Sequence, residues 1–168
     1  MTLRFKGALF SVLIVLLTLA TGCDNSKEVN QAIQAGEAYK NVEYTVTYHE
    51  DIFSEQSVLE RNKIIKPYLT EQYYAKAELN RYTTMPFLIV QKQQLSLEPE
   101  NLAFEPLNQP TENTYDLHYT LDFVLLDQDG NEVKRVPSKG LLTMMKVDGK
   151  WLVQADEPDW KVSAELSQ

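Results

Sequence analysis

The chain has 168 residues, with 24 acidic and 16 basic side chains and a formal net charge of −8 at pH 7. This length fits one domain with an appended segment, and 43% hydrophobic residues are enough for a single core. An acidic surface is repelled by nucleic acid, which we exclude as a partner. A single cysteine, Cys23, excludes a disulfide within the chain.

The N-terminal segment has the layout of a secretory signal peptide. Two basic residues precede an uncharged apolar run over 7–20, and small residues follow before Cys23. The run is about 14 residues long, whereas a membrane-spanning helix needs roughly 20. We therefore predict a signal peptide over 1–22, cleaved between Gly22 and Cys23, in preference to a retained transmembrane anchor.

The residues before the cut, Leu19-Ala20-Thr21-Gly22-Cys23, resemble the lipobox of bacterial lipoproteins, with alanine where leucine is usual. The resemblance implies that the Cys23 thiol carries a diacylglyceryl group, which holds the protein firmly to a membrane. Asp24 is similar to the signal that retains lipoproteins at the inner membrane. The implied location is the outer face of the cytoplasmic membrane. The alternative is an ordinary unpaired thiol in a signal peptide.

The first part of the mature chain is predicted to be a polar tether over 23–36, which can also become helical, followed by a domain over 37–157. Between 38 and 53 two patterns compete, since alternate residues suggest a strand while another set recurs every three or four residues. We favour a helix because that recurrence persists for four turns. The helical set is Tyr39, Val42, Val46, His49 and Phe53, and it places His49 as a partly buried core residue.

Two further helices are predicted from their end signals. Ser57 and Glu60 form a capping-box pair at a helix start. Lys66-Pro67 breaks that helix, because proline lacks a backbone donor. Thr70 can cap a third helix that runs to about Arg81, and a connector follows at Met85-Pro86.

The remainder is predicted to be antiparallel sheet. Extended segments lie within 87–97 and 102–104, and a long strand or two bent pieces lie within 133–147. Turns at Asp127–Gly130 and Asp148-Gly149 predict hairpins, and the tail over 158–168 is predicted to fray. The clearest alternation places Tyr115, Leu117, Tyr119, Leu121, Phe123 and Leu125 on one face.

Helices followed by a long meander are similar to the nuclear-transport-factor-2-like superfamily. The terminal hairpin over 145–153 and the run over 66–74 carry this resemblance. It implies an α+β fold in which a curved antiparallel sheet packs around N-terminal helices as a cone. A β-sandwich or a lipocalin-like barrel is the alternative fold, which the helical first third disfavours.

Enzymes of the cone fold place acidic, histidine or tyrosine side chains in the cavity. His118 and Asp122 lie four residues apart and share one face of a strand, where the carboxylate would raise the pKa of the imidazole and make it a general base. We favour the simpler interpretation that this polar row faces water. Two distant histidines without cysteine partners predict no zinc site, and we expect no cofactor.

We therefore expect a non-enzymatic, lipid-anchored domain that binds a protein partner or a small apolar ligand. Related cone-fold domains are scaffolding subunits of bacterial conjugation machinery, so the resemblance makes a protein partner reasonable. An isomerase or hydratase that uses His118 and Asp122 is the alternative. A ligand cavity would be lined by Tyr119, Leu121, Phe123 and Trp151.

Overall fold

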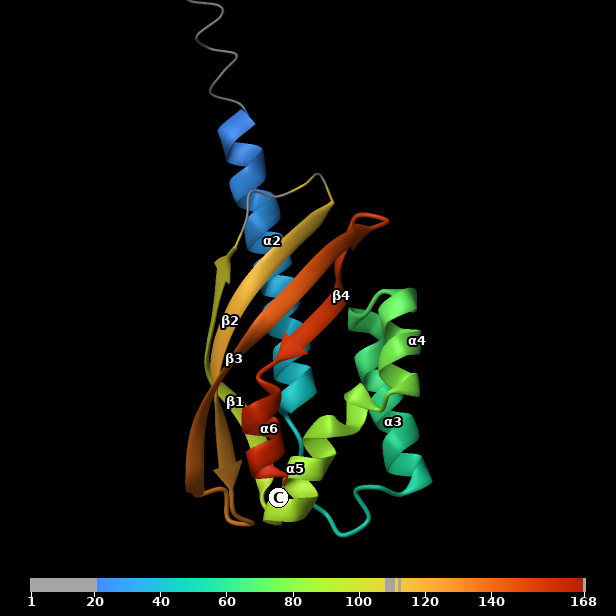
Figure 1. Ribbon diagram of the computed structural model, residues 1–168, viewed down its shortest axis with the longest axis vertical. Helices are drawn as coiled ribbons and strands as arrows, with labels where there is room; N and C mark the ends of the chain where they lie inside the picture. Colours follow the sequence, from blue (N-terminus) through green and yellow to red (C-terminus); the bar gives the residue numbers. More distant parts are fainter. Residues whose placement is uncertain (1–20, 108–110, 112, 168) are drawn as a thin grey trace, which may run out of the picture.

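The computed structural model describes residues 21–107, 111 and 113–167, with side chains from Ser26 onward. The predicted signal peptide covers residues 1–22, of which residues 1–20 lie outside this range. The fold is α+β, as expected, with helices packed against a four-stranded antiparallel sheet (Figure 1). The elements in chain order are α2 (Thr21–Tyr44), α3 (Glu55–Ile65), the 3-10 turn η1 (Lys66–Tyr68), α4 (Glu71–Leu79), the 3-10 turn η2 (Tyr82–Thr84), α5 (Met85–Gln93), β1 (Ser96–Pro106), β2 (Thr114–Leu126), β3 (Glu132–Val147), β4 (Lys150–Pro158) and α6 (Trp160–Leu166).

The sheet is a meander in which each strand pairs with the next along the chain, in the order β1-β2-β3-β4. The alternation predicted on β2 is confirmed, because all six residues of the apolar row are buried. Pro137 and Gly140 do not divide β3, which runs as one strand. Pro99 is accommodated in β1, an edge strand, as expected for a residue that cannot donate to a ladder.

Helix α2 lies across the inner face of the sheet. The spacer expected over 23–36 is the N-terminal part of this helix, and the predicted boundary at residue 37 falls inside it. Ala32 is fully buried, and a Cβ atom on Gly36 would lie 3.1 Å from the side chain of Leu142. Small residues at these positions let the helix approach the sheet closely.

The prediction that the first helix continues to Phe53 is wrong. Helix α2 ends at Tyr44, and the backbone of Val46 exchanges two hydrogen bonds of 2.8 Å with Leu97 at the start of β1. Pairing with the edge of the sheet therefore ends the helix, although the helical pattern of apolar residues continues to Phe53. His49 lies in the following loop and is exposed, so its predicted place in the core is also wrong.

The next two helices begin at side-chain caps. Ser54, and not Ser57, caps α3 by accepting a hydrogen bond from the backbone of Ser57, so the helix begins three residues earlier than the predicted capping box. Thr70 caps α4 through the backbone N–H of Tyr73, as predicted. The break at Pro67 is also confirmed, since η1 separates the two helices.

Two predictions about the later chain are wrong. Residues 87–93 belong to helix α5 and not to a strand, because the buried residues Pro86, Phe87, Ile89 and Val90 recur with helical spacing. The tail does not fray over its length, because α6 follows β4 and buries Leu166. Gln93 of α5 donates a hydrogen bond of 2.8 Å to the carbonyl of Leu166, which holds the two helices together.

Candidate functional site

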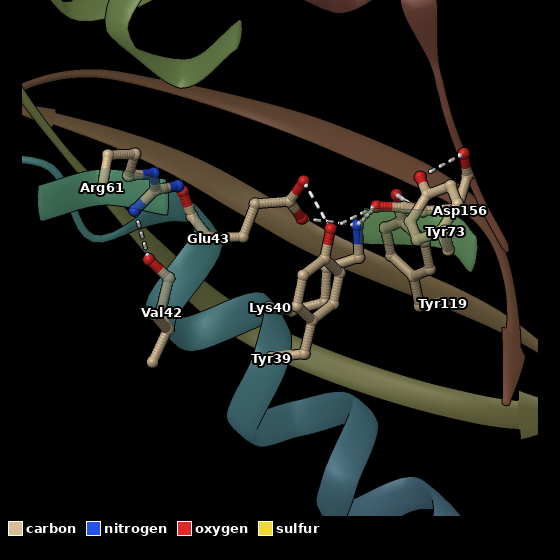
Figure 2. A network of polar contacts seen from close by, with 8 residues as sticks. All are labelled: Tyr39, Lys40, Val42, Glu43, Arg61, Tyr73, Tyr119 and Asp156. Carbon is tan, nitrogen blue, oxygen red and sulfur yellow. Dashed lines mark hydrogen bonds and ion pairs between the residues drawn. The ribbon is translucent and has the colours of Figure 1, made fainter. Parts of the chain in front are cut away.

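A group of charged and tyrosine side chains lies buried between α2 and the sheet (Figure 2). We call Tyr39, Lys40, Glu43, Tyr119 and Asp156 the buried charge cluster. The Lys40 side chain is fully buried, and its Nζ lies 2.6 Å from the Asp156 carboxylate and 2.7 Å from the Glu43 carboxylate. One cation thus joins the C-terminal part of α2 to β4.

The tyrosines of the cluster supply the remaining hydrogen bonds. Tyr39 Oη lies within donating distance of both carboxylates, 3.0 Å from Glu43 and 3.2 Å from Asp156. Tyr119 Oη donates to Asp156 at 3.4 Å, and its ring centroid lies 4.3 Å from the Lys40 Nζ. Within the part of the chain that the structure describes, every buried side-chain nitrogen and oxygen has a partner. Full satisfaction is what makes a buried ionic network tolerable.

Arg61 of α3 caps the C-terminal end of α2. Its guanidinium donates to the backbone carbonyls of Val42 at 2.8 Å, of Glu43, and of Thr83 at 2.9 Å. The last carbonyls of a helix have no partner within the helix and carry partial negative charge. The planar fork of arginine satisfies two of them at once and joins α3 to α2.

When both carboxyl groups are ionised, the cluster and Arg61 together carry two positive and two negative charges. Burial raises the pKa of Glu43 to about 7, with the Asp156 charge adding to this effect and the Lys40 charge opposing it. Burial alone would lower the pKa of Lys40, but the two carboxylates outweigh it and the pKa is raised. The two carboxylates therefore stabilise Lys40 in its charged form.

Gly140 of β3 allows Tyr119 to reach the cluster. A Cβ atom at this position would lie 2.4 Å from Tyr119 Oη and 2.7 Å from the backbone oxygen of Glu157. Such distances are closer than van der Waals contact, so only glycine lets the tyrosine cross the neighbouring strand here.

A cavity of about 20 Å³ adjoins the cluster, and Glu43, Tyr44, Tyr73, Asp156 and Trp160 are among its lining residues. This volume holds about one water molecule. The arrangement can bind a proton or a water, and it fastens α2 to β4. The sequence analysis missed the cluster because Lys40 and Asp156 are 116 residues apart. The sequence signal for the cluster was local: Lys40 and Glu43 lie three residues apart on a helix, beside tyrosines.

The predicted cavity-lining residues are core residues. Tyr119 belongs to the cluster, the Phe123 ring packs edge-on against Tyr44 at 4.7 Å, and the Trp151 ring lies 4.9 Å from Tyr115. Leu121 is 2% exposed and contributes to the wall of a surface pocket beside Pro137. These four residues therefore lie in the packed interior of the fold.

The polar row on β2 lies on the outer face of the sheet, away from the core. His118 and Asp122 share that face, as predicted, and both are partly exposed. The Asp122 carboxylate accepts hydrogen bonds from Asn101 at 2.7 Å and from Arg135 at 3.3 Å. Arg135 also pairs with Glu100 and Glu132, so Asp122 belongs to a surface ion-pair network.

Helix α3 carries two exposed apolar side chains that lie beside grooves. Leu59 is 61% exposed and borders a groove of about 440 Å³ shared with Phe53 and Val58. Ile64 is 54% exposed and borders a second groove, of about 340 Å³, on the other side of the helix. We call the exposed faces of Leu59 and Ile64, with the two grooves, the α3 surface.

Over the described ranges, no three histidine, cysteine, aspartate or glutamate side chains are placed to hold a metal ion. The helices that the structure describes include none with both the length and the apolar character needed to cross a membrane. Gly22 and Cys23 lie in the first turn of α2, and their side chains are outside the described set.

A scan against protein-family models found no match, and a search of curated proteins found none either. Among solved structures, the fold is similar to one described as a periplasmic fragment of TraM. The TM-score is 0.54 at 11% sequence identity, over 77% of this chain and 95% of that chain. At this identity the likeness concerns the fold alone.

Proposed function

We propose that the chain is a lipid-anchored domain on the outer face of the cytoplasmic membrane that binds a protein partner through the α3 surface. The single observation that carries the binding role is the exposure of Leu59 and Ile64 beside two grooves. Exposed apolar residues that line a concave surface are typical of interaction sites. The fold likeness to a periplasmic protein fragment supports the extracytoplasmic location.

The cavity beside the buried charge cluster is too small to hold a small apolar ligand. Drug-sized ligands occupy cavities of roughly 300 Å³ or more, whereas the cavity beside the buried charge cluster measures about 20 Å³. The order of helices and then a four-stranded meander supports kinship with the nuclear-transport-factor-2-like superfamily as part of this proposal.

The anchor is tested with Cys23→Ala in cells that express the full chain. We expect the wild-type protein in the membrane fraction, with an N-terminal peptide that begins at a lipid-modified Cys23 in mass spectrometry. The variant is expected to be released or left unprocessed. An unmodified thiol on a membrane-bound wild-type protein would contradict the proposal.

The binding surface is tested by in vivo photo-crosslinking with a photoreactive amino acid at position 59 or at position 134. Lys134 is an exposed residue of β3 and serves as the matched control. We expect discrete cross-linked products from position 59 that disappear when Ile64→Asp is added, and none from position 134. Equal cross-linking from both positions would show that α3 is no dedicated interface.

A further inference from the structure

One hydroxyl group in the buried charge cluster contacts two carboxyl groups. Tyr39 Oη lies 3.0 Å from Oε1 of Glu43 and 3.2 Å from Oδ2 of Asp156. A phenol has a single proton, so it donates to one of these carboxyl groups and turns a lone pair toward the other. The second contact is a hydrogen bond only when that other carboxyl group carries a proton of its own.

The contacts of the two acids place this extra proton on Glu43. Both oxygens of Asp156 accept hydrogen bonds, Oδ2 from Lys40 at 2.6 Å and Oδ1 from Tyr119 at 3.4 Å, which favours the carboxylate form. Oε1 of Glu43 faces the Tyr39 hydroxyl. A proton on Oε1 therefore donates to Tyr39 Oη, and the Tyr39 hydroxyl in turn donates to Asp156.

The balance of charge in the cluster favours the same protonation state. Lys40 bonds to both carboxyl groups, so two ionised acids would share one buried cation and leave an excess negative charge. The guanidinium of Arg61 donates its hydrogen bonds to backbone carbonyls. In agreement with the hydrogen-bond geometry, burial raises the pKa of Glu43 to about 7.

The tyrosines around Glu43 do not titrate near neutral pH, because burial raises the pKa of each of the four that interact with it. A further tyrosine of η2 lines the adjoining cavity. The titratable and charged groups that face Glu43 from the elements around it are Tyr39, Lys40 and Tyr44 of α2, Arg61 of α3, Tyr73 of α4, Tyr82 of η2, Tyr119 of β2 and Asp156 of β4.

A path for the proton adjoins the cluster. Glu43 and Asp156 both line the cavity of about 20 Å³, which has room for about one water molecule. Trp160 of α6 forms part of the same wall and is 44% exposed, so the cavity lies close to the surface. A water molecule in this cavity can carry a proton between Glu43 and the solvent.

Glu43 belongs to the attachment of α3 as well as to the cluster. Its side chain extends toward Tyr39 and Lys40, while its backbone carbonyl accepts from Arg61 (Figure 2). The buried residues of α3 are Arg61 and Ile65. The hydrogen bonds of Arg61 to the end of α2 are therefore a large part of what holds α3 in place.

We infer that the buried charge cluster is a proton-binding site that regulates the α3 surface. With the proton on Glu43, every contact of the cluster is satisfied and Arg61 holds α3 against α2. When Glu43 ionises, it competes with Asp156 for Lys40 and Tyr39, which displaces the end of α2 and loosens α3. This inference rests on the proposed function for the binding role of α3 and adds control by pH to it.

The proton is tested by infrared spectroscopy of the purified full chain at about pH 6 and about pH 8. We expect the carbonyl band of a protonated carboxylic acid at the lower pH, its loss at the higher pH, and its absence from Glu43→Gln. Tyr39→Phe is expected to shift the band, because the acid loses its acceptor. Glu105→Gln, which removes an exposed acid, is the control and keeps the band. A wild-type spectrum without the band at the lower pH would overturn the inference.

The coupling to α3 is tested by hydrogen exchange with mass spectrometry on the same protein. After correction for the intrinsic exchange rate, we expect α3 to open about tenfold more at about pH 8 than at about pH 6. Glu43→Gln is neutral at both values and is expected to show equal opening. Histidine is the usual side chain that titrates near neutral pH, and His49 borders the groove beside Ile64, so His49→Gln is the control that keeps the difference.

Two results would overturn the coupling: equal opening of wild-type α3 at both pH values, or loss of the difference in His49→Gln. Both experiments use the protein without a partner, so their failure leaves the proposed function standing. Absence of cross-linked products from position 59 would instead contradict the proposed function and leave the proton site standing.

Discussion

At the scale of single residues, Lys40 has the largest expected effect on stability. It is the one cation between two buried carboxylates, and removal of one partner of such a group leaves charge buried without compensation. We expect Lys40→Met to lower the free energy of unfolding by about 3–5 kcal/mol, measured by urea denaturation. Methionine is apolar and similar in length to lysine, so it keeps the core filled. The loss of stability therefore reports on the missing charge.

The control for Lys40 is Lys134→Met, which removes the same charge from an exposed position on β3. An exposed charge far from any buried partner contributes little to stability. Similar losses for the two variants would contradict the assignment of the cluster as the structural joint between α2 and β4.

Glu43 is expected to make stability depend on pH. Burial raises the pKa of Glu43 from 4.5 to about 7, so between these values the folded protein holds a proton that the unfolded chain has released. The free energy of unfolding therefore falls as pH rises through this window, by at most about 3 kcal/mol. We expect Glu43→Gln to flatten the curve between pH 4.5 and 7, measured by urea denaturation at each pH.

Glu105→Gln is the matched control for this measurement, because Glu105 is an exposed residue of β1. Its pH profile is expected to follow that of the wild type. An unchanged slope in Glu43→Gln would assign the pH dependence to another group.

At the scale of elements, α6 is expected to be part of the folding unit. Leu166 and Ser163 are buried, the Trp160 ring packs 5.6 Å from that of Tyr82, and α6 is bonded to α5 through Gln93. Deletion of residues 159–168 would expose the core under α5 and the cavity beside the cluster. We expect a loss of about 3 kcal/mol or more, read as a lowered urea midpoint. Deletion of Ser167 and Gln168 alone is the control, and equal midpoints in all three proteins would contradict this role.

The sequence predicted elements where a local pattern has one interpretation. The alternation on β2, the turn glycines at 130 and 149 and the cap at Thr70 act over a few residues, and the structure confirms them. The short apolar run of α5 suits a strand or a helix equally well, and only its packing against β1 and α6 decides between them. The end of α2 was not predicted for a related reason. It depends on the pairing of Val46 with Leu97 of β1, two residues that lie far apart in the sequence.

The candidate site was predictable only in part for the same physical reason. The alternation of apolar residues on β2 was enough to assign Tyr119 to the buried face of that strand. Lys40 and Asp156 could not be paired, because their meeting depends on how α2 crosses the sheet. A charged residue on an otherwise apolar helix face indicates a buried ionic contact, but the sequence does not identify the residue that it pairs with.

At the scale of the whole molecule, stability is expected to be uneven between the sheet and α3. Strand β2 is paired on both sides and buries most of its residues, whereas α3 buries only Arg61 and Ile65 among its residues. Backbone amides exchange with solvent fastest where few buried contacts oppose local opening. We expect amides of α3 to exchange far faster than those between Leu117 and Phe123, measured by hydrogen exchange with mass spectrometry.

The two ends of α2 provide an internal comparison in the same experiment. Amides near Lys40 lie against the buried charge cluster and are expected to exchange as slowly as β2, while those of the first turn exchange quickly. If the amides of α3 were protected from exchange to the same degree as those of β2, its exposed leucine and isoleucine would belong to a rigid part of the fold. Rapid exchange of α3 would instead show that this helix can open locally while the sheet stays fixed.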